Sequence, residues 1–141
     1  MTTELENIQI AQFVRGYLIA SLWASNDEMG EPLDDTYSIA DFSPETLRFM
    51  KQDCESFFKS NKGDIELYCA QVKTNPNEGT LLDYAGHDFW LTRNRHGCGF
   101  WDREGIEEEL GRRLTAATRV YPEIHLYVDT HNDGVEKIYA E

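Results

Sequence analysis

The sequence predicts a single α+β domain spanning residues 1–141, with N-terminal helices followed by the order β-β-α-β-β. Apolar residues recur at helical spacing up to about residue 73, and from residue 89 they alternate with polar residues as they do in strands. Elements segregated along a chain in this way favour a small, mostly antiparallel sheet covered by helices on one face. The length and the 40% content of apolar residues suit one globular domain with a single core.

Two helical regions are predicted in the N-terminal half. The first covers residues 3–25 and begins with a capping-box pattern, in which Thr3 is followed by Glu6. The second begins at Ser43, a hydroxyl cap followed by proline and an acid, and it continues to about residue 73 with a break near Gly63. Both regions carry an apolar stripe at intervals of three and four residues, so each would pack one face against the core.

Residues 26–42 interrupt the helical pattern between these two regions. They contain Gly, Pro and five acids from Asp27 to Asp35, so we expect a loop or an extended arm across the surface. Clustered carboxylates could hold a cation, but the spacing of a calcium-binding loop is absent. We therefore predict no metal site.

The segment GHDFWLTRNRHGCGFWDR, residues 86–103, is predicted to form the first hairpin. Phe89, Leu91 and Arg93 alternate with Trp90, Thr92 and Asn94 in a strand-like pattern. The sequence NRHG supplies a turn, and residues 98–101 return as a second strand. If Phe89 and Leu91 face the core, then Trp90 and its alternating neighbours face the opposite side of the sheet.

A helix and a second hairpin are predicted after this segment. Asp102 would cap a helix that runs from about residue 103 to 120. Alternating residues at 124–129 then predict a strand, which would pair with a last strand at 135–140 across the turn HNDG.

The 86–103 segment is also the predicted binding site, because its composition differs from the rest of the chain. It combines four large aromatic residues, three Arg, two His and three Gly within an acidic protein. Aromatic faces can stack on a flat base, while guanidinium groups form forked hydrogen bonds with an anion such as phosphate. The predicted ligand-binding residues are Trp90, Thr92, Arg93, Asn94, Arg95, His96, Trp101 and Arg103.

Two other interpretations of the same segment stay open. In the structural one, the aromatic residues pack across the strands, and Arg93 and Arg103 pair with Asp88 and Asp102. In the catalytic one, His87 or His96 is a general base. No paired zinc motif and no phosphate-binding glycine loop of Walker or Rossmann spacing occurs in the sequence, so we expect no cofactor.

The charge of the chain limits its partners. The formal net charge is −13, and the 86–103 segment is the only part of the chain that is not acidic overall. A negative field repels nucleic-acid backbones, so direct nucleic-acid binding is not expected. No stretch is apolar enough for a membrane span, and the N-terminus carries acids where a signal peptide is basic. We therefore expect a cytoplasmic protein.

Two stretches of the sequence resemble proteins of a known group and suggest where the chain originates. The stretch SLWASNDEMGEPLDDTYSIADFSPETLRFMKQDCESFF, together with the core GHDFWLTRN-x-HG-x-GFWDR, resembles a family of small uncharacterised proteins of phages, prophages and some bacteria. The similarity covers most of residues 15–128. It implies action in a host cytoplasm, but it carries no known activity, so it assigns no role to any residue.

These observations predict a phage-encoded, non-enzymatic binding protein that acts against a host function such as a defence system. Its partner would be a host protein, inhibited by an acidic surface that imitates a phosphate backbone, or a nucleotide-like small molecule. The alternatives are a small enzyme that acts on nucleotides or nucleic acid with a His general base, and a structural or accessory phage protein. Self-association into a homo-oligomer also stays open.

Overall fold

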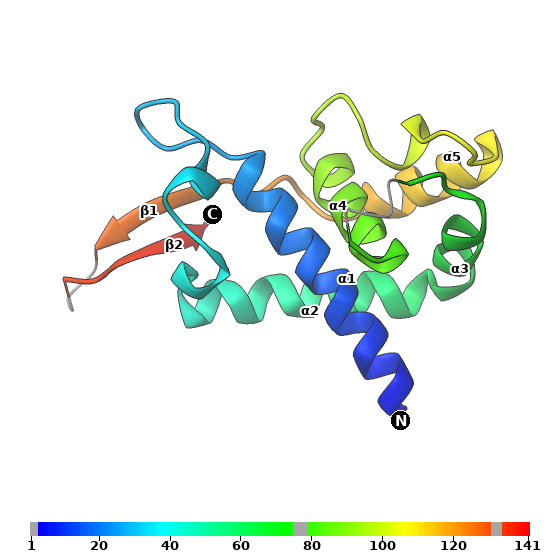
Figure 1. The fold of residues 1–141 in the computed structure, drawn as a ribbon, viewed down its shortest axis with the longest axis horizontal. Coiled ribbons are helices and arrows are strands. Elements are labelled where there is room, and N and C mark those ends of the chain that lie inside the picture. Colours follow the sequence, from blue (N-terminus) through cyan, green and yellow to red (C-terminus); the bar gives the residue numbers. More distant parts are fainter. Residues whose placement is uncertain (1–2, 75–78, 131–133) are drawn as a thin grey trace.

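The structure is a computed structural model that describes residues 3–74, 79–130 and 134–141. These residues form five α-helices, short 3-10 helices and one antiparallel pair of strands (Figure 1). The helices are α1 (Glu4–Trp23), α2 (Pro44–Ser60), α3 (Lys62–Gln71), α4 (Leu81–Arg93) and α5 (Glu108–Thr118), the strands are β1 (Leu126–Thr130) and β2 (Glu136–Ala140), and the 3-10 helices are η1 (Leu33–Asp35), η2 (Ile39–Asp41) and η4 (Phe100–Asp102).

The predicted β-β-α-β-β order is wrong, because the first of its two hairpins does not exist. Residues 89–93 belong to α4, and of residues 98–101 the first two precede η4 while Phe100 and Trp101 belong to it. The described part of the chain is therefore mainly helical, with one two-stranded sheet near its C-terminal end. No helix in the described ranges combines the length and the apolar character that crossing a membrane requires.

Burial of α4 on nearly all sides explains the wrong strand prediction. Every residue from Asp88 to Arg93 is buried, so this part of the helix has no polar face to produce a period of 3.6. A short apolar run of this kind cannot be distinguished from a strand by periodicity. The sequence does mark where the helix begins, since Thr80 and Asp83 form a capping box at its N-terminus.

The predicted turn NRHG is instead the C-terminal cap of α4. The amide of His96 donates to the carbonyl of Leu91 at 3.0 Å, and the amide of Arg95 donates to the carbonyl of Thr92 at 3.3 Å. This pair of bonds is a Schellman motif, which requires a left-handed residue after the helix. Arg95 takes that conformation with φ 57°, although glycine is the usual residue there.

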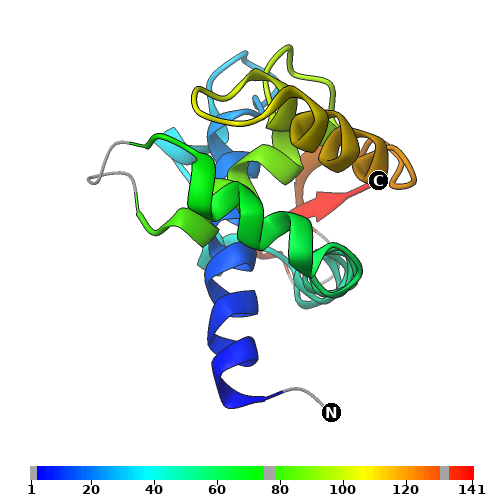
Figure 2. The same ribbon diagram turned by 90° about the vertical axis from the view of Figure 1, so that its right-hand side faces the viewer.

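Helices α1 and α4 cross with their backbones in contact at two glycines. A Cβ at Gly16 would lie 1.9 Å from the carbonyl oxygen of Asp83, and a Cβ at Gly86 would lie 2.0 Å from that of Phe13. Neither distance leaves room for a side chain. The two glycines therefore set how closely the helices approach, whereas the N-terminal part of α1 projects beyond the other helices (Figures 1 and 2).

Aromatic rings from several helices form the core beside this crossing. Phe13 of α1, Phe57 of α2 and Phe89 of α4 are fully buried, and the rings of Phe57 and Phe89 stack with their centroids 4.1 Å apart. Phe100 of η4 packs against Phe57 at 5.9 Å. Ring pairs at these distances add to the stabilisation that burial of their apolar area already gives.

An ion pair also links the two crossing helices. Arg15 of α1 donates to both carboxylate oxygens of Asp83, at 2.7 and 2.6 Å, and Asp83 also accepts from the amide and hydroxyl of Thr80. Burial raises the pKa of Asp83, but the hydrogen bonds from Arg15 and Thr80 outweigh it, so the pKa lies below its usual value.

The other predicted elements agree with the structure in part. The helix at 3–25 is confirmed with Thr3 as its cap, and the second helical region is confirmed, although its break lies at Asn61. The helix predicted after Asp102 begins later, at Glu108. The C-terminal strands are confirmed. The predicted turn HNDG, residues 131–134, lies largely outside the described residues.

The loop predicted at residues 26–42 is confirmed and contains η1 and η2. We call the whole connection between α1 and α2, residues 24–43, the acidic arm. It runs beside the hairpin (Figure 1) and is attached to β2. The amide of Ser43 donates to the carbonyl of Ile138 at 3.0 Å, and the hydroxyl of Tyr37 donates to Glu136.

The glycine crossing predicts a large effect of one added methyl group. We expect Gly86→Ala to lower the free energy of unfolding by about 3 kcal/mol or more, because the helices must separate to admit the Cβ. Gly63→Ala is the matched control, since no atom lies within 4 Å of a Cβ at this helical position. It should raise the stability by about 0.5–1 kcal/mol. Urea unfolding followed by circular dichroism measures both, and similar effects of the two substitutions would contradict the crossing.

The ion pair between α1 and α4 predicts a pH-dependent loss in Asp83→Asn. Folding lowers the pKa of Asp83, so the ionised carboxylate stabilises the protein above the pKa of the unfolded state, about 3.9. This stabilisation is lost as the pH falls through the lower pKa of the folded state. We expect the variant to be less stable by roughly 1 kcal/mol near neutral pH. The difference should vanish in acid when unfolding is measured over a pH series. A difference that did not change with pH would show that the charge of Asp83 is not responsible.

Candidate functional site

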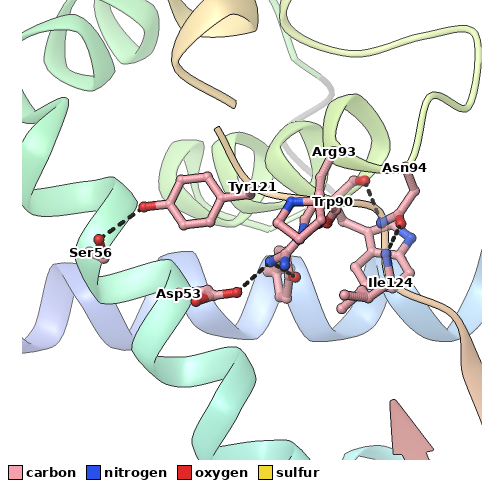
Figure 3. Close-up of polar contacts among 9 residues, drawn as sticks. Asp53, Ser56, Trp90, Arg93, Asn94, Tyr121 and Ile124 are labelled. Atoms are coloured by element: carbon pink, nitrogen blue, oxygen red, sulfur yellow. Dashed lines mark hydrogen bonds and ion pairs between the residues drawn. The ribbon is translucent and has the colours of Figure 1, made fainter. Parts of the chain in front are cut away.

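Arg93, a predicted ligand-binding residue, lies inside the protein and joins four segments of the chain. Its side chain is 1% exposed. It donates to Asp53 of α2 at 2.7 Å, to the hydroxyl of Tyr17 of α1 at 3.1 Å, and to the carbonyl of Pro122 at 2.7 Å (Figure 3). Its guanidinium also lies 5.4 Å from the ring centroid of Tyr121. The hydrogen-bonding capacity expected to hold an anionic ligand is therefore used within the protein.

Arg103 is held in a second internal ion pair. It donates to both oxygens of the buried Asp88, at distances from 2.5 to 3.0 Å, and Asp88 also accepts from the hydroxyl of Tyr68 at 2.5 Å. The ring of Tyr84 lies 5.2 Å from the guanidinium. The partner expected in the structural interpretation, Asp88, is thus the partner found for Arg103. Burial and the charge of Asp88 both raise the pKa of Tyr68, so its phenol remains a donor.

Two more predicted binding residues stabilise the chain that follows α4. The hydroxyl of buried Thr92 accepts from the amide of Phe100 at 3.1 Å. Asn94 accepts from the amide of Ile124 at 2.9 Å and donates to the carbonyl of Trp90 at 3.1 Å (Figure 3). Both side chains therefore have internal partners that fix the segments on either side of α5.

The remaining predicted residues lie nearer the surface. Arg95 is exposed and pairs with Glu123 at 3.1 Å, and His96 is also exposed. Trp101 is 51% exposed on η4. His87, the other candidate base, is half-buried, with its ring centroid 6.1 Å from that of Tyr84. The predicted set is therefore divided between the core and separate parts of the surface.

Three of the predicted binding residues line one cavity. Trp90, Asn94 and His96 share a cavity of about 530 Å³ with residues from the end of α1, from the strand β1 and from Glu141. Trp101, Arg93 and Arg103 are not in its lining. Trp90 and Trp101, both predicted to bind one ligand, therefore do not line the same cavity.

The acidic arm and the hairpin form a second concave surface, the arm groove. It has a volume of about 630 Å³ and is lined by acidic, aromatic and apolar side chains. Four carboxylates contribute to it, two from the arm and two from the hairpin. The acidic lining residues are Asp27, Glu28, Asp129 and Glu136, and the larger aromatic and apolar ones include Met29, Tyr37 and Tyr127.

Hydrogen bonds within the acidic arm fix its conformation. Asp27 accepts from the amides of Met29 and Glu31 at 2.8 and 3.0 Å, and Asn26 and Pro32 form a β-bridge. The hydrogen bond to Glu136 raises the pKa of Tyr37 to about 12. The phenol therefore remains protonated near neutral pH and keeps donating to the hairpin.

The charges around the arm groove are not balanced by cations of the same segment. No Lys or Arg occurs between Arg15 and Arg48, an interval that contains seven acids. Glu28, Asp34 and Asp35 are exposed, and none of the three takes part in an ion pair among the described residues. These acids were not among the predicted site residues. The absence of cations over this interval is the signal that could have done so.

Most cations of the chain already have carboxylate partners. Nine of the 13 Lys and Arg residues are in ion pairs within the described residues, so little positive charge faces solvent without an acid beside it. They are Arg15, Lys59, Lys62, Lys73, Arg93, Arg95, Arg103, Arg112 and Arg113.

Neither a metal-binding cluster of the described residues nor a similar protein indicates the function of these surfaces, so their geometry carries the interpretation. Over residues 3–74, 79–130 and 134–141, no three His, Cys, Asp or Glu side chains are placed to hold a metal ion together. No family model, curated protein or solved structure matches the chain.

Two arginines of the same segment should differ sharply when they are substituted. We expect Arg93→Ala to lower the free energy of unfolding by about 3–5 kcal/mol, because it leaves Asp53 and the surrounding polar groups without their buried partner. Arg95→Ala, the matched control, should change it by less than about 0.5 kcal/mol, since the ion pair with Glu123 is exposed. Chemical unfolding tests both, and a small effect of Arg93→Ala would argue that this arginine is available for binding.

Proposed function

We propose that this chain is a non-enzymatic binding protein that inhibits a basic, nucleic-acid-binding protein by presenting carboxylates in place of phosphates. The observation that carries the proposal is the run from Arg15 to Arg48, in which seven acids have no cation of their own segment. As the resemblance to phage proteins implies, the target would be a host protein in the cytoplasm.

The arm groove supports the choice of a protein partner. Carboxylates from the arm and from the hairpin face the same concave surface, beside Met29, which is 85% exposed, and two tyrosines. Aromatic residues and methionine are enriched in protein interfaces, and opposite charges steer association. The combination fits Lys and Arg side chains, whose stems are apolar and whose ends are cationic.

The hydrogen bonds of the arm support tight association. A mobile acidic loop would lose conformational entropy when a partner ordered it, whereas this one is already tied to itself and to β2. Carboxylates held at fixed positions can also match a basic surface more closely than a disordered acidic tail does.

The internal ion pairs of Arg93 and Arg103 weigh against binding of a phosphate-bearing ligand at the 86–103 segment. To bind phosphate, these groups would have to leave Asp53 and Asp88, and each separation would leave a charge without its partner. Most of the remaining cations are also paired. A basic partner is therefore favoured over an acidic one.

A displacement experiment tests the proposal. Proteins of a bacterial extract are bound to DNA-cellulose, and the column is then washed with the purified chain at constant ionic strength. We expect specific DNA-binding proteins to elute in complex with the chain. The complex should weaken steeply as salt is raised, because its attraction is electrostatic. Elution of nothing beyond the buffer control would overturn the proposal.

Matched charge variants locate the surface that is responsible. The arm variant combines Glu28→Gln, Asp34→Asn and Asp35→Asn, and it should lose most of the displacement. The control combines Glu4→Gln, Glu66→Gln and Glu107→Gln, exposed acids outside the arm, and changes the net charge by the same amount. Equal loss in both variants would show that net charge alone, and not the position of the acids on the arm, causes displacement.

A further inference from the structure

The outer edge of the strand β1 has backbone groups that point away from its partner strand. His125 and Glu141, just beyond the strands, exchange two backbone hydrogen bonds at 2.9 and 3.0 Å. Hydrogen-bonded and non-hydrogen-bonded pairs alternate along an antiparallel ladder, so the N–H and C=O of Val128, which lies opposite Ile138, point away from β2. Among the described residues, no backbone hydrogen bond joins Val128 to a segment outside the hairpin. The edge of β1 is therefore open at this residue.

The outer edge of β2, by contrast, already has a partner. The carbonyl of Ile138 accepts from the amide of Ser43 at 3.0 Å, and Phe42 forms a β-bridge with Ile138. These contacts agree with backbone groups that point outward at this pair of the ladder. The acidic arm thus covers the edge of β2, and the edge of β1 is where a strand of another chain can extend the sheet.

The arm groove follows the open edge of β1. Leu126 and Val128 point to one face of the hairpin, while Tyr127 and Asp129 point to the other. All four line the arm groove, to which β2 contributes Glu136. A concave surface that successive residues of one strand line in this way runs along the edge of the strand. Leu126 is buried and Val128 is half-buried, so the accessible part of the edge begins at Val128.

The charges of the arm groove select the occupant of this edge. Asp27, Glu28, Asp129 and Glu136 line the groove, and among the described residues no Lys or Arg does. A second copy of the chain is disfavoured, because pairing β1 with β1 would place like charges opposite each other. An extended segment with Lys or Arg at alternate positions would instead bring cations to these carboxylates.

We propose that the open edge of β1 receives an extended basic segment of the partner protein, which adds a strand beside β1. Its backbone exchanges two hydrogen bonds with the N–H and C=O of Val128, and its Lys or Arg side chains reach Glu28 and Asp129. In strand addition the backbone hydrogen bonds give affinity and the side chains give specificity. This inference rests on the proposed function for the choice of a basic partner, and it adds how that partner is held.

Hydrogen exchange in the full chain tests the pairing directly. Without a ligand, the amide of Val128 should exchange faster than those of Tyr127 and Asp129, which the ladder bonds to β2. The probe is a short synthetic peptide in which Arg and Val alternate. We expect it to slow the exchange of the Val128 amide saturably. No slowing would overturn the proposal, and so would protection of this amide in the chain alone, because the edge would then already be paired.

A modified peptide separates backbone pairing from attraction between charges. The same peptide with methylated backbone amides keeps its Arg side chains but cannot donate a backbone hydrogen bond. It should bind roughly 2- to 12-fold more weakly than the unmodified peptide, measured by calorimetry. Equal affinity of the two peptides would show that the cations alone are recognised, which contradicts strand addition.

Two substitutions at one position test the same bond from the side of the protein. Val128→Pro removes the N–H that points outward, at an edge position where proline is tolerated, and it should weaken binding of the unmodified peptide roughly 2- to 12-fold. Val128→Thr keeps the amide and should bind the peptide normally. Equal binding by the two variants would contradict the proposal. If Val128→Pro disturbs the hairpin, the methylated peptide decides, because it leaves the protein unchanged.

The DNA-cellulose column separates this inference from the proposed function. If folded Val128→Pro displaces DNA-binding proteins as well as Val128→Thr does, the acidic arm is sufficient, so strand addition is overturned while the proposed function stands. If the peptide protects the Val128 amide but the chain displaces no protein, the proposed function fails while the pairing at β1 stands.

Discussion

Backbone contact between α1 and α4 is the constraint on which the other features depend. Gly16 and Gly86 bring the two helices so close that α4 is enclosed by the rest of the chain, and Phe89 can stack on Phe57 of α2. Enclosure has a consequence for the polar residues of α4. Asp83, Asp88 and Arg93 cannot reach water freely, so each must find a partner from another segment of the chain.

The ion pairs and hydrogen bonds of these buried charged residues connect α4 to other elements. Arg93 joins α4 to α1, α2 and the chain before β1, and Asp88 joins it to α3 and to the chain after η4. Burying such pairs adds little net stability, because desolvation opposes the attraction, but removing one partner is costly. We infer that they select one arrangement of helices from many that would bury similar apolar area. The unusual composition of residues 86–103 therefore has, in large part, a structural reason.

The sequence was informative where elements have one polar face and misleading where they have none. The sequence predicted the helix at 3–25, the helix that begins after Ser43 and the C-terminal hairpin. In each of them exposed polar residues alternate with buried apolar ones at the period of a helix or a strand. Helix α4 was not predicted, because residues 89–94 were interpreted as two alternating faces of a strand although residues 88–93 are all buried, and the capping box at Thr80 was overlooked. Of the predicted binding residues, Trp90, Asn94 and His96 line one cavity. The structural interpretation did name Asp88 as a partner for these arginines, Arg93 and Arg103. No local pattern indicates that Arg93 pairs with Asp53 of α2, since such a pair depends on the tertiary fold.

The attachment of the acidic arm to β2 makes the acidic surface depend on the last strand of the chain. The amide of Ser43 donates to Ile138 and the hydroxyl of Tyr37 donates to Glu136, so β2 holds the arm in its position. A chain interrupted before β2 would carry the same acids without the geometry that arranges them.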